Sequence, residues 1–224
     1  MIRSVVSAMT LLATVVETSN TVAQTRSRTA KVAALAALVK SLGPEEVEIG
    51  VTFLIGETRQ GKLGASYSAL RDVRSGGAAS QPSLTLTEID QAFADFVSTR
   101  GSRSVATPKA LLGALFSRAT AAEQDFLVRL IVGELRQGAL AGIMLDAIAA
   151  AAGVPQQAVR RAAMYANDLG AMARAALAEG VSGLGKFQLR TLHPIEPMLA
   201  QTAEDVADAL GQLGEAAFDW KLDG

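Results

Sequence analysis

The chain has 224 residues, half of them hydrophobic, and its 21 Lys and Arg residues against 22 Asp and Glu give a net charge of −1. It contains no cysteine, which excludes disulfide bonds and cysteine-ligated metal sites. The length permits one large domain or two small ones, and the hydrophobic residues are mainly Ala, Leu and Val with few aromatics. This composition favours a mainly α-helical protein over a sheet protein.

The net charge is near zero, whereas nucleic-acid-binding domains typically have an excess of basic residues. The charges are nevertheless segregated along the chain, with cations concentrated in 26–31, 100–109 and 160–161 and acids in 45–48 and 204–208. Such clusters attract phosphate locally when they share a surface, whereas solvated helix faces are the ordinary explanation. Charge alone therefore leaves nucleic-acid binding open.

The beginning of the chain predicts an amphipathic helix rather than a signal peptide or a membrane span. Its hydrophobic residues recur at helical spacing at Leu11, Leu12, Val15 and Val16. A second helix is predicted over 21–42 and a third over 44–55, because Gly43 and Pro44 separate them. A glycine-bearing loop over 56–64 and a linker over 75–83 follow.

Helix starts in the middle of the chain are marked by threonines. We expect capping at Thr87 with Asp90, at Thr107 before Pro108, and at Thr120 with Glu123. Further helices are predicted over 142–152, 155–169 and 171–179.

The composition changes after Gly180. Strands are predicted over 187–192 and 216–222, with a proline-bearing extended segment over 193–200 and a helix starting at Thr202 and Asp205. We expect a helical domain over 1–190, followed over 191–224 by a linker and the truncated start of a second, α/β domain.

An internal repeat is the sharpest pattern in the sequence. Residues 56–63, Gly-Glu-Thr-Arg-Gln-Gly-Lys-Leu, match residues 133–140, Gly-Glu-Leu-Arg-Gln-Gly-Ala-Leu, at six of eight positions. Each copy follows a hydrophobic helix. This predicts that a unit made of a helix, a glycine loop and a second helix occurs twice in the fold. A third Gly-x₄-Gly spacing occurs at Gly180 and Gly185 without the Glu-x-Arg-Gln filling.

A glycine loop between two helices is suited to binding phosphate without sequence preference. Glycine lets a nucleic-acid backbone approach closely, and free N–H groups at the following helix donate to phosphate oxygens. Arg59 and Arg136 would supply a forked cation in each copy. The plain alternative is glycine at a helix C-terminus followed by a reverse turn.

The blocks of the chain, taken in order, resemble ATP-dependent DNA ligases of the bacterial and archaeal-eukaryotic type, most closely those of actinobacteria. The resemblance rests on residues 101–104, 119–127, 133–139, 159–162, 193–200 and the terminal Lys221-Leu222-Asp223-Gly224. By itself Lys-x-Asp-Gly is a weak pattern that a strand entering a turn would explain. The order of the blocks is much more specific than any one of them.

The resemblance implies an all-helical DNA-binding domain that runs into the start of a nucleotidyltransferase domain. It implies that Lys221 is the nucleophile that attacks the α-phosphate of ATP to form lysyl-AMP. Asp219 stands where the family usually has a Glu that helps to hold adenine, so the shorter side chain puts that role in doubt. The candidate DNA contacts, from the resemblance and the repeat together, are Arg59, Gly61, Gly133, Glu134, Leu135, Arg136, Gly138, Ala139, Gly183, Gly185 and Lys186.

The resulting hypothesis is a helical clamp that docks a ligase on nicked double-stranded DNA, with ATP and Mg²⁺ as cofactors of the complete enzyme. We expect a cytoplasmic, nucleoid-associated monomer without membrane contact, and no ligation by these 224 residues alone. No metal site is expected within them. Two alternatives remain: a fragment of another lysine nucleotidyltransferase, of the RNA ligase or capping type, or a helical protein-interaction scaffold.

Overall fold

The computed structural model describes residues 9–99, 108–135, 141–195 and 203–216. Helices account for most of these residues, and within the described ranges no β-sheet forms, although two isolated bridges join Leu11 to Thr85 and Ala79 to Thr120. The helices are α1 (Leu12–Gln24), α2 (Arg28–Ser41), α3 (Val47–Leu54), α4 (Tyr67–Arg74), α5 (Leu86–Ser98), α6 (Pro108–Arg118), α7 (Ala121–Val132), α8 (Ala141–Ala152), α9 (Gln156–Ala163), α10 (Leu169–Leu184) and α11 (Val206–Leu213). The expectation of a mainly α protein is confirmed.

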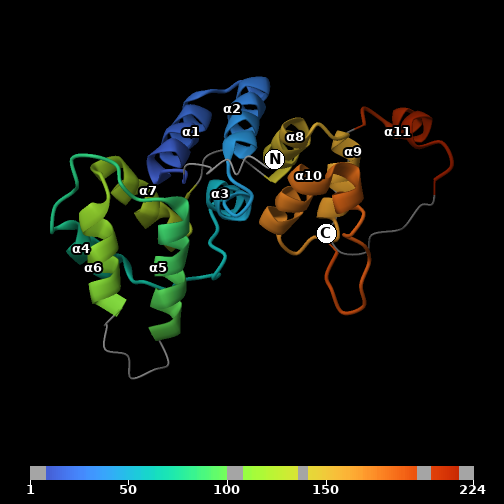
Figure 1. Ribbon diagram of the computed structural model, residues 1–224. Helices are drawn as coiled ribbons and strands as arrows, with labels where there is room; N and C mark the ends of the chain where they lie inside the picture. The colour runs from blue at the N-terminus through green and yellow to red at the C-terminus, as the bar shows by residue number, and fades with distance from the viewer. Residues whose placement is uncertain (1–8, 100–107, 136–140, 196–202, 217–224) are drawn as a thin grey trace, which may run out of the picture.

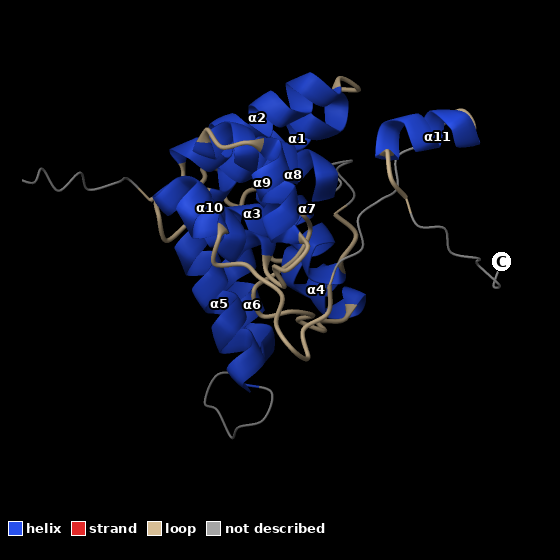
Figure 2. Cartoon of the chain, turned by 90° about the vertical axis from the view of Figure 1, so that its right-hand side faces the viewer, coloured by secondary structure: helices blue, strands red, loops and turns tan. Residues whose placement is uncertain are grey.

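The helices gather in two groups around a central helix. Figure 1 shows α4 to α7 on one side and α8 to α10 on the other, with α3 between them and α1 and α2 above. The packing agrees, because α3 contacts both α5 and α10 while α2 packs along α8. The turned view in Figure 2 and the view in Figure 1 both place α11 apart from the other helices, and none of its residues is buried.

The core is built from Leu, Val, Ile and Ala with a few large aromatic rings. Phe53, Phe93, Phe116 and Phe126 are fully buried. The rings of Phe53 and Phe93 lie 6.0 Å apart between centroids, and this contact fastens α3 to α5. Small residues let helices approach closely elsewhere. A Cβ on Gly170, at the start of α10, would lie 2.6 Å from the backbone oxygen of Glu48 in α3.

The first predicted helix is confirmed and the second is wrong at its start. Leu12, Val15 and Val16 are buried in α1, although Leu11 lies before the helix and is more exposed. The predicted helix over 21–42 is two helices, because Ser27 caps a new helix by accepting a hydrogen bond from the N–H of Ala30. A serine cap breaks a helix without glycine or proline, which is why the pattern missed it.

The capping prediction at Thr120 and Glu123 is confirmed, with both hydrogen bonds of the capping box present at the start of α7. The prediction at Thr87 and Asp90 is wrong by two residues. Thr85 is the N-cap of α5 and Glu88 is its partner in the box. The hydrogen bond from the backbone N–H of Thr85 is the main reason why the pKa of Glu88 lies below its ordinary value. Thr107 lies outside the described residues.

The strand predicted over 187–192 is wrong, because these residues are irregular and Leu192 adopts a left-handed φ of 65°. A helix is present in this region, but Asp205 is the N-cap of α11 rather than the partner of a cap at Thr202, because it accepts from the N–H of Asp208; Thr202 lies outside the described residues. Almost all of the strand predicted over 216–222 lies outside the described residues. Within the described ranges no helix is long and apolar enough to cross a membrane.

Candidate nucleic-acid interface

The two copies of the sequence repeat begin with the same backbone motif. Gly56 follows α3 with φ 83°, and Gly133 follows α7 with φ 77°. In each copy the glycine N–H donates to the carbonyl three residues earlier, and the next N–H donates to the carbonyl five residues earlier. This pair of bonds is the Schellman motif, which requires the left-handed conformation that glycine adopts without strain. The repeat in the sequence is therefore a repeat in structure where both copies are described.

The two glycine loops touch each other. A Cβ on Gly56 would lie 3.2 Å from the backbone oxygen of Leu135 and 3.4 Å from its Cβ, so the second loop crosses directly over the first. Leu135 is buried, and it fixes the second loop to the core. Glu57 and Glu134, one residue after each glycine, are both exposed. Two segments whose glycines are 77 residues apart in the sequence therefore lie in contact at Gly56 and Leu135.

The arginine of the first loop is held by acids rather than left free. Arg59 forms ion pairs with Glu48 at 3.3 Å and with Asp90 at 3.2 Å, and its side chain is 39% exposed. Gln60 donates to both the backbone and the carboxylate of Asp90. Gly61 has a left-handed φ of 71° and open space around the position of a Cβ. A phosphate at this loop would share Arg59 with two carboxylates.

The third glycine spacing forms a different structure. Gly180 interrupts α10 with φ 62° and ψ −137°, and the chain folds back so that a Cβ on Gly183 would lie 2.3 Å from the backbone oxygen of Ala175. Packing alone therefore explains a glycine at position 183. Lys186 is exposed and pairs with Glu179. DNA contact by Gly183, Gly185 and Lys186 stays a prediction.

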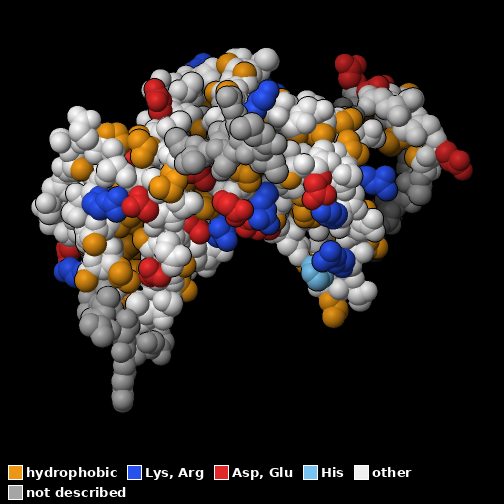
Figure 3. Space-filling view, viewed as in Figure 1, with side chains coloured by type: hydrophobic (Ala, Val, Ile, Leu, Met, Phe, Trp, Pro, Cys, Tyr) orange, Lys and Arg blue, Asp and Glu red, His pale blue; other side chains and the backbone are white. Residues whose placement is uncertain are grey.

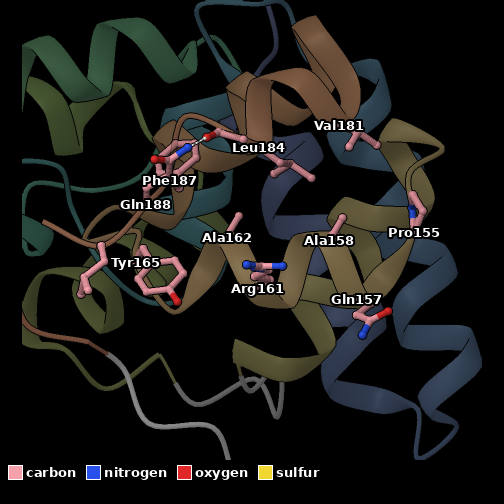
Figure 4. A pocket seen from close by; sticks show the side chains of 12 residues that line it. Pro155, Gln157, Ala158, Arg161, Ala162, Tyr165, Val181, Leu184, Phe187 and Gln188 are labelled. Carbon is pink, nitrogen blue, oxygen red and sulfur yellow. Dashed lines mark hydrogen bonds between the residues drawn. The ribbon is translucent and has the colours of Figure 1, made fainter.

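A shallow groove lies between this folded-back segment and α9. Figure 4 shows Arg161 of α9 and Tyr165, which follows α9, on one wall, with Leu184, Phe187 and Gln188 on the other. The groove is open to solvent and mostly apolar, and Arg161 is the single charged residue among those that line it. Gln188 donates to the backbone oxygen of Gly185, which keeps the segment closed on itself.

Several predicted site residues lie outside the described part of the chain. These are Arg136, Gly138, Ala139, Asp219 and Lys221. Their roles stay predictions. The described residues contain no group of three or more His, Asp or Glu side chains that could hold a metal ion.

Charges of both signs alternate over the middle of the molecule. Figure 3 shows basic and acidic side chains next to one another on this face rather than a continuous basic surface. Glu48 in α3 explains part of this mixture, because it pairs with Arg174 as well as with Arg59. The prediction from charge clustering did not include these pairings, since the partners come from α3, the first glycine loop and α10.

A second acid that joins two arginines was also missed. Asp146 in α8 is nearly buried, with 8% of its side chain exposed, and its two oxygens pair with Arg28 at 2.7 Å and with Arg160 at 3.0 Å. The signal in the sequence was a lone carboxylate in a helix that is otherwise alanine and large aliphatic residues. Burial opposes the ionisation of Asp146, but the two arginines outweigh it and hold its pKa below the ordinary value.

This lowered pKa makes the stability of the fold dependent on pH. The ion pairs stabilise the protein fully above the unfolded pKa of about 4, and this contribution is lost as the pH falls through the lower folded pKa. We expect Asp146→Asn to reduce the free energy of unfolding by about 1–2 kcal/mol at pH 7, since both guanidinium groups are half exposed. The difference from the wild type should shrink toward zero below about pH 3.

Urea unfolding followed by circular dichroism at pH 7 and at pH 3 measures this difference. Asp125→Asn is the control, because Asp125 is an exposed acid that pairs with Arg74 on the surface. It should change the free energy of unfolding by less than about 0.5 kcal/mol at either pH. A loss in Asp146→Asn that is equal at both pH values would contradict the prediction.

Comparison with known proteins relates this chain to DNA ligases. The family described as DNA ligase N terminus matches residues 57–149, which include the second glycine loop and all of the first except Gly56. A probable DNA ligase of Anaeromyxobacter sp. (strain Fw109-5) is 49% identical over 95% of this chain and 41% of its own length. Probable DNA ligases of Saccharopolyspora erythraea and Mycolicibacterium gilvum are 50% and 48% identical, each over 96% of this chain and 42% of its own length.

The chain thus spans about two-fifths of the length of the curated relatives that it matches. The matched residues begin just after α3 and Gly56, and they run through α4 to α7 and the second glycine loop into α8. The helical architecture agrees with a ligase N-terminal domain, and the identity extends beyond that domain on both sides. The chain thus contains a segment that matches the DNA ligase N terminus, and along nearly all of its length it is similar to probable DNA ligases.

Proposed function

We propose that the chain docks an ATP-dependent DNA ligase on nicked double-stranded DNA. The observation that carries the proposal is the contact between two glycine loops with the same Schellman motif, of which Gly133 lies inside the matched residues and Gly56 directly precedes them. Neither alternative, an RNA ligase or capping enzyme or a protein-interaction scaffold, gains support from any relative reported above.

The loops are suited to a sugar-phosphate backbone. The left-handed glycines have no Cβ, and open space surrounds Gly61 and Gly133 where one would stand. A backbone can therefore approach the chain closely there, and contacts to phosphate and sugar read no base sequence. Binding through these loops is accordingly proposed to be independent of DNA sequence.

The chemistry is proposed to begin at Lys221. Its deprotonated amine would attack the α-phosphorus of ATP, so that a P–N bond forms, the P–O bond to the β-phosphate breaks and pyrophosphate leaves. Asp219 is proposed to contact the adenine with a shorter reach than Glu. We propose Mg²⁺ as a cofactor of the complete ligase, where it would neutralise charge on the triphosphate.

The proposal extends to the state of the protein. We propose that the ligase acts as a monomer at the nucleoid in the cytoplasm. The 224 residues alone are expected to bind DNA without sealing a nick, because they span about two-fifths of their relatives.

Removal of the arginine from the second loop tests this docking role. Arg136→Ala is expected to weaken binding to unrelated duplex sequences by a similar factor, and to reduce the slope of log affinity against log salt by about 1. Fluorescence anisotropy of labelled duplexes across a salt series measures both quantities. Arg59→Ala is the matched variant from the first loop, and it should have the smaller effect because Glu48 and Asp90 already neutralise Arg59.

An unchanged affinity and slope in Arg136→Ala would remove this residue from the DNA contact. Equal losses in Arg59→Ala and Arg136→Ala would show instead that the two loops bind phosphate in the same way. Affinity for RNA ends in preference to duplex DNA would favour the RNA ligase or capping alternative. No affinity for any nucleic acid would favour the scaffold.

A further inference from the structure

Three helices carry an excess of positive charge, and one of them, α8, follows the second glycine loop in the chain. The turn before α2, together with α2, α8 and α9, contains one carboxylate, Asp146. We use the name basic patch for five cations of these segments, of which the second and fourth pair with Asp146: Arg26, Arg28, Lys31, Arg160 and Arg161. The helices pack together, with α2 against α8 and α8 against α9, and the pairing of Arg28 and Arg160 with Asp146 joins their surfaces. In a chain of net charge −1 this concentration is a local exception.

The arginines of the basic patch are oriented but not neutralised. Each uses one terminal nitrogen for Asp146, and their side chains remain 57% and 50% exposed. The other N–H groups of two guanidiniums are therefore free to donate to a ligand in solvent. Among the described residues, Arg26, Lys31 and Arg161 form no ion pair. One carboxylate thus sets the geometry of two arginines while the surface keeps a net positive charge.

The position of Arg28 is unfavourable for the fold alone. It is the first residue of α2, and it also reaches the backbone oxygen of Gly142 at the start of α8. The N-terminal end of a helix carries a partial positive charge, so a cation there lowers stability, and neither helix has an acid in its first turn. Arg160 and Arg161 lie in the last turn of α9, where the dipole favours them. Asp146 offsets only part of this positive potential, so the start of α2 is suited to a further anion.

We propose that the basic patch is a second contact surface for the phosphate backbone of duplex DNA, separate from the glycine loops. The proposal rests on the proposed DNA-docking function. Arg28 and Arg160 would hold a phosphate in the geometry that Asp146 imposes, and Lys31, Arg26 and Arg161 would neutralise neighbouring phosphates. Asp146 is a positioning residue in this account, because it acts on DNA through the two arginines.

Paired substitutions that remove two charges each test the basic patch. Lys31→Gln combined with Arg161→Gln disturbs no ion pair of the described residues, so the fold should be intact. The first expected result is a decrease of about 1–2 in the slope of log affinity against log salt, with about tenfold weaker duplex binding at low salt. Arg28→Gln combined with Arg160→Gln should have at least the same effect.

The matched control is Arg74→Gln combined with Arg118→Gln. These arginines are similarly exposed and pair with Asp125 and Glu88 on the other group of helices, so the change in net charge is the same. The salt slope of this control should equal that of the wild-type chain. Circular dichroism of every variant verifies folding. If the variant of Arg28 and Arg160 unfolds, the salt slope of Lys31→Gln with Arg161→Gln tests the basic patch by itself.

Equal slopes in the wild-type chain and in both patch variants would overturn the proposal while leaving the docking function in place. A loss of slope in the control as large as in the patch variants would also overturn it, because total charge would then explain the effect. A wild-type chain that binds no duplex at low salt would overturn both the basic patch and the proposed function.

Discussion

Replacement of Lys221 by alanine in the full ligase is expected to abolish formation of the covalent adenylate. The amine of Lys221 is proposed as the atom that bonds to the α-phosphorus, and alanine has no nucleophile to replace it. Incubation with ATP labelled at the α-phosphate, followed by denaturing electrophoresis, should show no label on the variant. Duplex binding should be unchanged, since the proposed DNA contacts lie in the glycine loops and the basic patch.

Two further variants separate nucleophilicity from charge. Lys221→Arg keeps the positive charge, but a guanidinium stays protonated, so it should also remain unlabelled. Lys109→Ala removes an exposed lysine of α6, which pairs with Asp72 of α4. This variant should be labelled like the wild type. AMP retained on Lys221→Ala would show that another residue is the nucleophile.

Gly170→Ala is expected to cause a large loss of stability from the addition of one methyl group. The new Cβ would lie 2.6 Å from the backbone oxygen of Glu48 and 2.8 Å from Oγ1 of Thr52, so α10 must move away from α3. Overpacking of this kind costs about 1–3 kcal/mol. For a chain of this size the melting temperature should fall by roughly 2–12 °C, measured by differential scanning calorimetry.

Gly113→Ala makes the same chemical change, but it is expected to raise the stability rather than lower it. Gly113 lies within α6, and no atom stands within 4 Å of the position of its Cβ. Alanine loses less conformational entropy in a helix than glycine, so this variant should gain about 0.5–1 kcal/mol. Equal effects of the two substitutions would show that the close approach of α3 and α10 does not limit stability.

The fold class and most helices were predictable because their signals are local. The Thr120 and Glu123 box lies within four residues, and buried positions such as Leu12, Val15 and Val16 recur at helical spacing. The errors arose where two local signals competed. Thr85 and Thr87 both precede acids, and the structure selects Thr85 because its partner Glu88 reaches back to cap it. At Ser27 a capping serine ended a helical pattern that had no glycine or proline.

The individual residues of the site were predictable from the sequence, but their contacts with one another were not. The repeat identified Gly56 and Gly133, and both adopt the left-handed conformation that a loop of this kind needs. Their contact through Leu135 depends on the packing of α3 near α7, which no sequence spacing encodes. The same reason hid the pairing of Arg28 and Arg160 through Asp146, since these residues come from three helices.

Binding of the 224-residue chain to nicked and intact duplexes of the same sequence tests the central claim most directly. Anisotropy across a salt series should show affinity for both duplexes, stronger for the nicked one, with log affinity falling linearly against log salt. A slope that corresponds to several phosphate contacts would agree with the glycine loops and the basic patch acting together. Absence of salt-dependent binding to either duplex at low salt would contradict the account of this chain as a DNA-docking domain.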